Sequence, residues 1–413
     1  KFEFSFIAKH DLLFPKNPEN VFSFRIFIDV TDSNGETQST ENSINIGYQT
    51  LRLGLEIPKK LCKENIKQEF ENSFSVQTKN LNGNFVPAKG KIAIFKLEEP
   101  LEVLRKRHWT KPDKYIYSKN EWENLFAGNE YKNETEIENL KKSIKKLEIN
   151  FDTKNNKSIN LENISDWKTG RYLVELSSKD TFGNDVFKKQ YFTLFSEKEK
   201  TCPVVASLWC STISNKYEVG ETAKIAIGSA LKNASILLET RQENTVLHFE
   251  WIKLENEQKL FEIPILKNYR GNVFIHFTLV RNNRHYTFEE KIDVPYSNKK
   301  LDIEFETFRD KILPGSQEEW KITIKNKDGE TESAEMLACL YDKSLDSFKK
   351  NVWGLNIYKK CYNATTRSAT CFRSNYSDDA SRISIKYKEV PFETYDYLNW
   401  FGFNDYSLTE MRE

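Results

Sequence analysis

The stretch that decides the fold is Val219-Gly220-Glu221-Thr222-Ala223-Lys224-Ile225-Ala226-Ile227. Here a glycine turn leads into apolar residues at every second position, which predicts a β-strand with one buried and one solvated face. Variants of the stretch occur at residues 88–95 and 314–324, so the pattern recurs about every hundred residues. In each copy a glycine (Gly90, Gly220 or Gly315) is expected to supply the permissive backbone of the turn.

Three alternating segments also end in turn-forming residues, which predicts β-hairpins. Residues 24–30 run into a turn at 32–35, residues 172–176 into one at 179–183, and residues 273–280 into the pair Asn282-Asn283. Short strands joined in this way predict two-sheet sandwiches of roughly a hundred residues. The fold class is therefore all-β, a tandem of immunoglobulin-like or fibronectin-III-like sandwiches.

Proline residues or charged clusters interrupt the alternation near residues 57–60, 196–200 and 294–298. These breaks predict four domains. Residues 1–58 are expected to be the second half of a sandwich, and residues 59–198, 199–297 and 298–413 one sandwich each.

One segment of the second domain departs from the strand pattern. Residues 118–147 are rich in Glu, Lys and Asn, and their apolar residues lie near helical spacing, which predicts a small helical insertion. Ser118 with Glu121 three residues later matches the capping box that begins a helix.

The charge balance excludes whole classes of partner. Lys and Arg number 62 against 61 Asp and Glu, for a net charge of +1. No field of that size draws a protein onto nucleic acid or an anionic membrane, and no apolar run reaches the roughly 20 residues of a membrane span. The chain opens on an alternating segment without Met, so we expect it to be part of a longer protein.

The six cysteines are too sparse for a disulfide scaffold, and no CxxC pair indicates a zinc site. We expect no metal site. Cys361 and Cys371 flank a Ser/Thr/Asn-rich stretch, a spacing that permits a disulfide bond, and Cys202 and Cys210 lie similarly close.

No motif for catalysis is present. The sequence has no GxSxG elbow, HExxH helix, phosphate loop or GxGxxG turn, and its five histidines are scattered, although His276 and His285 are expected on neighbouring strands. We therefore expect no catalytic residue, cofactor or small-molecule substrate. The basic aromatic run 104–112 is interpreted as a solvated loop. The aromatic segment 395–403 predicts either an edge strand or a contact surface.

Four phrases carry a resemblance to a known family. They lie at residues 29–39, 87–92, 304–316 and 334–346, the last reading Ala-Glu-Met-Leu-Ala-Cys-Leu-Tyr-Asp-Lys-Ser-Leu-Asp. They resemble bacterial alpha-2-macroglobulins of the large outer-membrane-associated kind. The resemblance implies consecutive macroglobulin-like domains ahead of a protease-sensitive bait region.

The same resemblance implies a function and a location. The parent protein would be a broad-range endopeptidase inhibitor that traps proteases after bait cleavage, periplasmic or outer-membrane-associated and lipid-anchored, with proteases and an outer-membrane protein as partners. Many family members carry a thioester in a Gly-Cys-x-Glu-Gln motif, which these residues lack. Two other classes remain open: a surface adhesion or assembly module of tandem sandwiches, and an enzyme.

Overall fold

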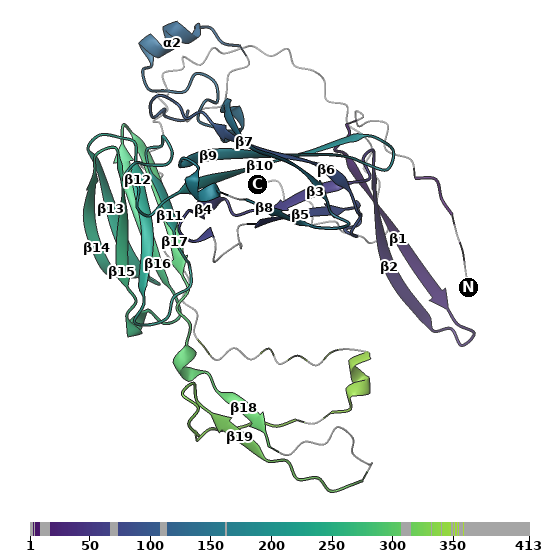
Figure 1. Ribbon diagram of the computed structural model, residues 1–413. Coiled ribbons are helices and arrows are strands. Elements are labelled where there is room, and N and C mark those ends of the chain that lie inside the picture. The colour runs from purple at the N-terminus through teal and green to yellow at the C-terminus, as the bar shows by residue number, and fades with distance from the viewer. Residues whose placement is uncertain are drawn as a thin grey trace, which may run out of the picture. The chain divides into compact units, whose positions relative to one another are not determined.

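The computed structural model describes residues 3, 5–8, 17–66, 73–107, 114–161, 163–306, 315–331, 333–339, 341–347, 350, 352, 354 and 358. Strands dominate these ranges, which confirms the all-β class (Figure 1). The described strands form two sandwiches and two separate two-stranded ribbons.

Sandwich 1 spans residues 51–195 and packs a three-stranded sheet against a five-stranded sheet (Figure 1). The smaller sheet has the order β3 (Arg52–Glu56), β5 (Ser73–Lys79), β8 (Ser158–Asn160). The larger has the order β4 (Lys60–Cys62), β10 (Asp185–Phe195), β9 (Gly170–Lys179), β6 (Lys89–Leu97), β7 (Lys142–Asp152). Only the short β4 runs parallel to its neighbour within this sheet; the other pairs are antiparallel.

The core of sandwich 1 follows from the two-residue period of its strands. Ile92 and Ile94 of β6 are fully buried, as are Val174 and Leu176 of β9, and Val76 of β5 meets them from the other sheet. The strand predicted at residues 88–95 is therefore confirmed.

Tyr172 holds the start of β9 in place through a hydrogen bond and a ring contact. Its hydroxyl donates a 2.5 Å hydrogen bond to the carbonyl of Lys168, four residues upstream, and its ring stacks on Phe192 at 5.1 Å. This is the geometry of the tyrosine corner found in immunoglobulin-like sandwiches. Burial raises the pKa of Tyr172, so the hydroxyl remains a donor.

Sandwich 2 spans residues 209–294 and has seven strands. One sheet has the order β11 (Trp209–Thr212), β12 (Thr222–Ser229), β15 (Glu257–Pro264). The other has the order β14 (Thr245–Leu254), β13 (Ala234–Gln242), β16 (Val273–Arg281), β17 (Arg284–Ile292). Asn282 and Asn283 both have positive φ, 49° and 54°, as a two-residue hairpin turn requires, so the hairpin predicted there is confirmed.

A single turn type recurs four times in the described part of the chain. Each copy has the pattern Asx-x-x-Gly-x and begins at Asp32, Asn80, Asp180 or Asn326. In every copy the side-chain oxygen of the first residue accepts hydrogen bonds of 2.9–3.0 Å from the N–H groups two and four residues later. The glycine has φ between 81° and 86°. The first and third copies are turns predicted from the sequence; the other two were missed.

The glycines of the three repeated stretches do not share one role. Gly220 and Gly315 have φ of 95° and 83°, as expected for turns. Gly90 instead lies inside β6 without a positive φ, so the turn role expected of it is wrong. A Cβ there would overlap the carbonyl oxygen of Ser177 and come within 2.5 Å of the Phe151 ring. Gly90 is needed because β9 and Phe151 approach it closely.

The helical insertion is shorter than predicted. The α-helix α2 (Lys119–Leu125) begins at Ser118 with the predicted capping box to Glu121, and a 3-10 turn follows at Ile137–Asn139. Residues 126–136 between them are not helical, and the helical prediction also fails from Lys142 onward, because Ile144 and Leu147 lie on β7. Leu147 pairs with Ile94 and packs against the core, so its apolar character serves the sheet.

The limits of the two sandwiches differ in part from the predicted breaks. Leu51, Leu53 and Leu55 precede the break at residues 57–60 but belong to the core of sandwich 1. At the second break, β10 ends at Phe195 and β11 begins at Trp209. The division of the chain into four domains remains a prediction.

The two ribbons lie outside the sandwich cores. β1 (Val21–Thr31) pairs with β2 (Thr37–Gly47), which confirms the first predicted hairpin, and β18 (Asp302–Phe305) pairs with β19 (Ile322–Lys325). No described residue after Val294 is buried. Most of the domain predicted at 298–413 lies outside the described residues.

Candidate functional site

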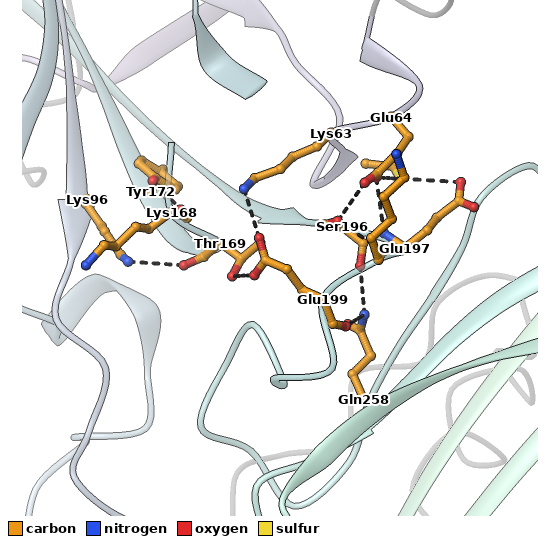
Figure 2. Close-up of polar contacts among 12 residues, drawn as sticks. Lys63, Glu64, Lys96, Lys168, Thr169, Tyr172, Ser196, Glu197, Glu199 and Gln258 are labelled. Carbon is orange, nitrogen blue, oxygen red and sulfur yellow. Dashed lines mark hydrogen bonds and ion pairs between the residues drawn. The ribbon is translucent and has the colours of Figure 1, made fainter. Parts of the chain in front are cut away.

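The most elaborate polar arrangement in the described residues is the joint between the two sandwiches. It is built around the linker, residues 196–208, and Figure 2 shows its side chains. The linker is held from sandwich 1 on one side and from sandwich 2 on the other.

From sandwich 1, Glu64 holds the start of the linker. Its carboxylate accepts a 2.6 Å hydrogen bond from the Ser196 hydroxyl and a 3.1 Å bond from the Glu197 backbone N–H (Figure 2). The Cys62 thiol donates to the same carboxylate at 3.1 Å. Burial alone raises the pKa of Glu64, but these three donors outweigh it and leave the pKa below its usual value.

From sandwich 2, Gln258 on β15 holds the same segment. Its side-chain amide donates to the carbonyl oxygens of Ser196 at 2.8 Å and Glu199 at 3.0 Å, and its backbone N–H donates to Lys200 (Figure 2). Gln258 is 4% exposed. One buried side chain therefore satisfies two linker carbonyls that would otherwise lack partners.

Charged pairs flank this arrangement. Lys63 pairs with Glu199 at 2.9 Å, the Thr169 hydroxyl donates to Glu199 at 2.6 Å, and Lys224 of sandwich 2 pairs with Glu197 at 3.6 Å. These groups are partly exposed, so the pairs contribute little by themselves. They do neutralise the two linker carboxylates.

An apolar cluster lies at the same joint. Cys62 and Phe195 of sandwich 1 pack with Val204 of the linker and with Trp209 and Ala226 of sandwich 2. The rings of Phe195 and Trp209 meet edge to face at 5.2 Å. The joint thus combines buried apolar area with a hydrogen-bonded polar network, in which the side-chain oxygen of Gln258 is buried without a hydrogen-bond partner among the described residues.

Two basic side chains, Lys60 and Arg284, also link the sandwiches away from this centre. Lys60 donates to the carbonyl of Cys210 and lies 4.5 Å from the centre of the Phe288 ring. Arg284 of β17 donates to the carbonyl of Lys106, at the base of the insertion, at 3.3 Å. Burial lowers the pKa of Lys60.

The joint also contains the candidate metal ligands of the described residues. One donor atom each from Cys62, Glu64 and Glu197 lies within 4.8 Å of the others. Burial and the hydrogen bond to Glu64 raise the pKa of Cys62 to about 12, so the thiol keeps its proton and acts as a donor. The group fits a hydrogen-bonded thiol, and the prediction that no metal binds stays untested.

Of the two cysteine pairs considered from the sequence, only Cys202 and Cys210 are described, and they form no disulfide; the Cys361–Cys371 bond stays a prediction. Cys202 and Cys210, like Cys62, are free thiols, while Cys361 and Cys371 lie outside the described residues. His276 and His285 do lie on neighbouring strands, but the register pairs them with Glu289 and Val280, so the two are not cross-strand partners.

A cleft of about 850 Å³ lies beside the insertion. Its wall carries lysines and glutamates that interact locally: Lys119 pairs with Glu123 at 3.6 Å, and Glu134 accepts from the backbone of Lys132 at 2.8 Å. These are solvated charges on an exposed surface.

Neither Glu64 nor Gln258 was identified as a site residue from the sequence. Each is one of many carboxylates or amides, and only the charged linker segment stood out, as a break between domains. Their role depends on partners that are 59 to 133 residues away in the sequence.

The described residues define a tandem β-sandwich protein whose two sandwiches are joined by a hydrogen-bonded and apolar interface. Within them, no helix is long and apolar enough to cross a membrane. Residues 208–346, which contain sandwich 2 and the β18–β19 ribbon, match the family model for the alpha-2-macroglobulin bait region domain. This part of the chain is therefore similar to the bait region domain of alpha-2-macroglobulins.

Solved structures of low similarity include members of that family. The native conformation of E. coli alpha-2-macroglobulin is 13% identical, with a TM-score of 0.26, over 75% of this chain and 19% of that chain. Salmonella alpha-2-macroglobulin reacted with methylamine is 12% identical, with a TM-score of 0.25, over 77% and 19%. A tetra-tandem repeat from the extending region of a large adhesion protein is 13% identical, with a TM-score of 0.19, over 75% and 72%.

These TM-scores are too low to carry an argument. The chain spans about a fifth of the length of the two macroglobulins. No protein of curated function matches the chain.

Proposed function

We propose that the chain is a structural segment of a broad-range endopeptidase inhibitor that traps proteases after bait cleavage. The observation that carries this proposal is the match of residues 208–346 to the alpha-2-macroglobulin bait region domain. In this role the chain is not an enzyme. It works outside the cytoplasm, in the periplasm or at the outer membrane, in a lipid-anchored parent protein, and its partners are proteases and an outer-membrane protein.

The two sandwiches would be the frame, and the chain after Val294 the region that a protease can reach. Proteases need an exposed, extended backbone, and no described residue after Val294 is buried. Residues 333–339 are exposed and have no regular secondary structure. A cut there would leave the cores of both sandwiches intact.

The test uses the full-length parent protein and proteases that differ in side-chain preference. We expect an early cut that maps after Val294, followed by retention of the protease, which keeps its activity on small peptides and loses it on large proteins. A protease that stays free and fully active on large substrates contradicts the proposal. Tight binding to a glycan or outer-membrane partner without any cut would support the adhesion alternative instead.

A further inference from the structure

We propose that sandwiches 1 and 2 move as one body, locked by Gln258 across the linker, and that the chain pivots elsewhere. This inference concerns the mechanics of the chain and does not depend on protease trapping.

The linker cannot open in steps. Glu64 of sandwich 1 and Gln258 of sandwich 2 both bind Ser196, one through its hydroxyl and the other through its carbonyl. Separating the sandwiches at this point breaks one set of bonds and leaves buried polar groups without partners. Such groups are costly, so partly open states are disfavoured.

Opening the joint would also expose the apolar cluster around Phe195 and Trp209. Phe195 is 1% exposed and Trp209 is 7% exposed, and each is covered by the other's sandwich. The hydrogen bonds and the cluster must therefore be lost together, which is the behaviour of a cooperative interface rather than a hinge.

The connection between the β1–β2 ribbon and sandwich 1 is different. The Thr50 N–H donates to Asp180 at 3.1 Å, the Gln49 side chain to the carbonyl of Asp185 at 2.8 Å, and the Asn45 N–H to Asn82 at 2.7 Å. No described residue of the ribbon belongs to a buried apolar cluster. Among the described residues, the hydrogen bonds at this connection are partly exposed and no buried apolar cluster bridges it, so residues 47–50 are the expected pivot.

Thiol labelling provides the test, because free cysteines lie in the joint. Cys62 is 5% exposed and Cys202 packs against the same cluster, whereas Cys210 belongs to the core of sandwich 2. The measurement is site-resolved alkylation of the 413-residue chain in native buffer, read by mass spectrometry. The remaining three cysteines are replaced with serine: Cys339, Cys361 and Cys371.

Gln258→Ala should accelerate labelling of Cys62 and Cys202 by about tenfold or more, since two buried hydrogen bonds are lost. Labelling of Cys210 should change much less. The matched control is Gln242→Ala: Gln242 also donates to two carbonyls, at 3.1 and 3.2 Å, but both lie in sandwich 2. This control should leave the Cys62 rate within about twofold.

The proposal is wrong if the alkylation rate of Cys62 is unchanged in Gln258→Ala, or if Gln242→Ala accelerates it equally. A second measurement keeps the proposal testable if Gln258→Ala does not fold. In protein that keeps Gln258 and has the same three cysteines replaced with serine, spin labels on the exposed positions Lys188 and Lys253 should give one narrow distance, and labels on Gln38 and Lys188 a broad distribution. A broad distribution for the first pair contradicts the inference.

Discussion

Replacing Gly90 with alanine tests the close packing inside sandwich 1. Gly90 lies on β6, opposite Ser178 of β9 and Phe151 of β7. An added Cβ would overlap the carbonyl oxygen of Ser177 and lie 2.5 Å and 2.8 Å from two carbons of the Phe151 ring. Carbon atoms in contact normally stay about 3.5–4.0 Å apart. The Ser177 oxygen belongs to the backbone of β9, so it cannot rotate away as a side chain can.

The cost follows from what must move. If β6 and β9 separate, the ladder at Gly90 loses hydrogen bonds worth about 1 kcal/mol each, and forcing Phe151 aside costs about 1–3 kcal/mol as overpacking. Together these give a loss of about 3 kcal/mol. With a urea m-value of about 2 kcal/mol per molar, the unfolding midpoint of sandwich 1 should fall by about 1.5 M.

The matched control is Gly54→Ala on β3. There the new Cβ meets only Gln77, whose Cβ lies at 3.4 Å and whose backbone and side-chain oxygens both lie at 3.9 Å, all ordinary contacts. This variant should be as stable as the wild type or slightly more so, since alanine restricts the unfolded chain. Because the chain has more than one cooperative unit, unfolding is followed by hydrogen exchange of peptides from sandwich 1. Equal midpoints for the two variants would refute the close-approach explanation.

Three further predictions concern the joint, the tyrosine corner and a surface carboxylate. Gly228→Ala places a Cβ 2.8 Å from the Cys202 sulfur, so it should destabilise the joint and speed alkylation of that thiol. Adding Cys202→Ala should restore the stability measured by urea unfolding; if it does not, the strain arises elsewhere. Tyr172→Phe removes a buried hydrogen bond and should cost sandwich 1 about 1–1.5 kcal/mol in the same assay, and an unchanged midpoint would contradict the corner. Hydrogen bonds from two lysines lower the pKa of Glu148 to about 2, so its stabilising contribution is complete above about pH 4.5 and is lost only as the pH falls through about 2; an NMR titration midpoint near 4.5 would contradict this.

The sequence predicted what is decided locally. Alternation and turn residues specified the hairpin after Val30 and the Asn282-Asn283 turn, because strand period and turn chemistry act over a few residues. The capping box at Ser118 was found for the same reason. The helix was extended too far because apolar residues at 144 and 147 fit both a helical spacing and one face of a strand.

The predictions that failed concern residues whose roles depend on partners far away in the sequence. The role of Gly90 is set by a carbonyl on β9, and β4 joins its sheet by pairing in parallel with β10, from Lys60 to Thr193. Leu51 and Leu53 look like the end of one unit in the sequence, yet they pack into the next. Local patterns do not record which core a strand enters.

The joint raises the question of why its centre is polar. The linker backbone itself brings the carbonyls of Ser196, Glu199 and Lys200 to the interface, and each of them accepts a bond from Gln258. An apolar residue at position 258 would add buried apolar area but would orphan two carbonyls, at a cost of about 1–3 kcal/mol each. Packing alone tolerates small shifts between surfaces, whereas a side-chain amide that bridges two carbonyls works in one register only. The polar centre therefore specifies which arrangement of linker and strand is stable, and the apolar cluster around Phe195 and Trp209 supplies the driving force.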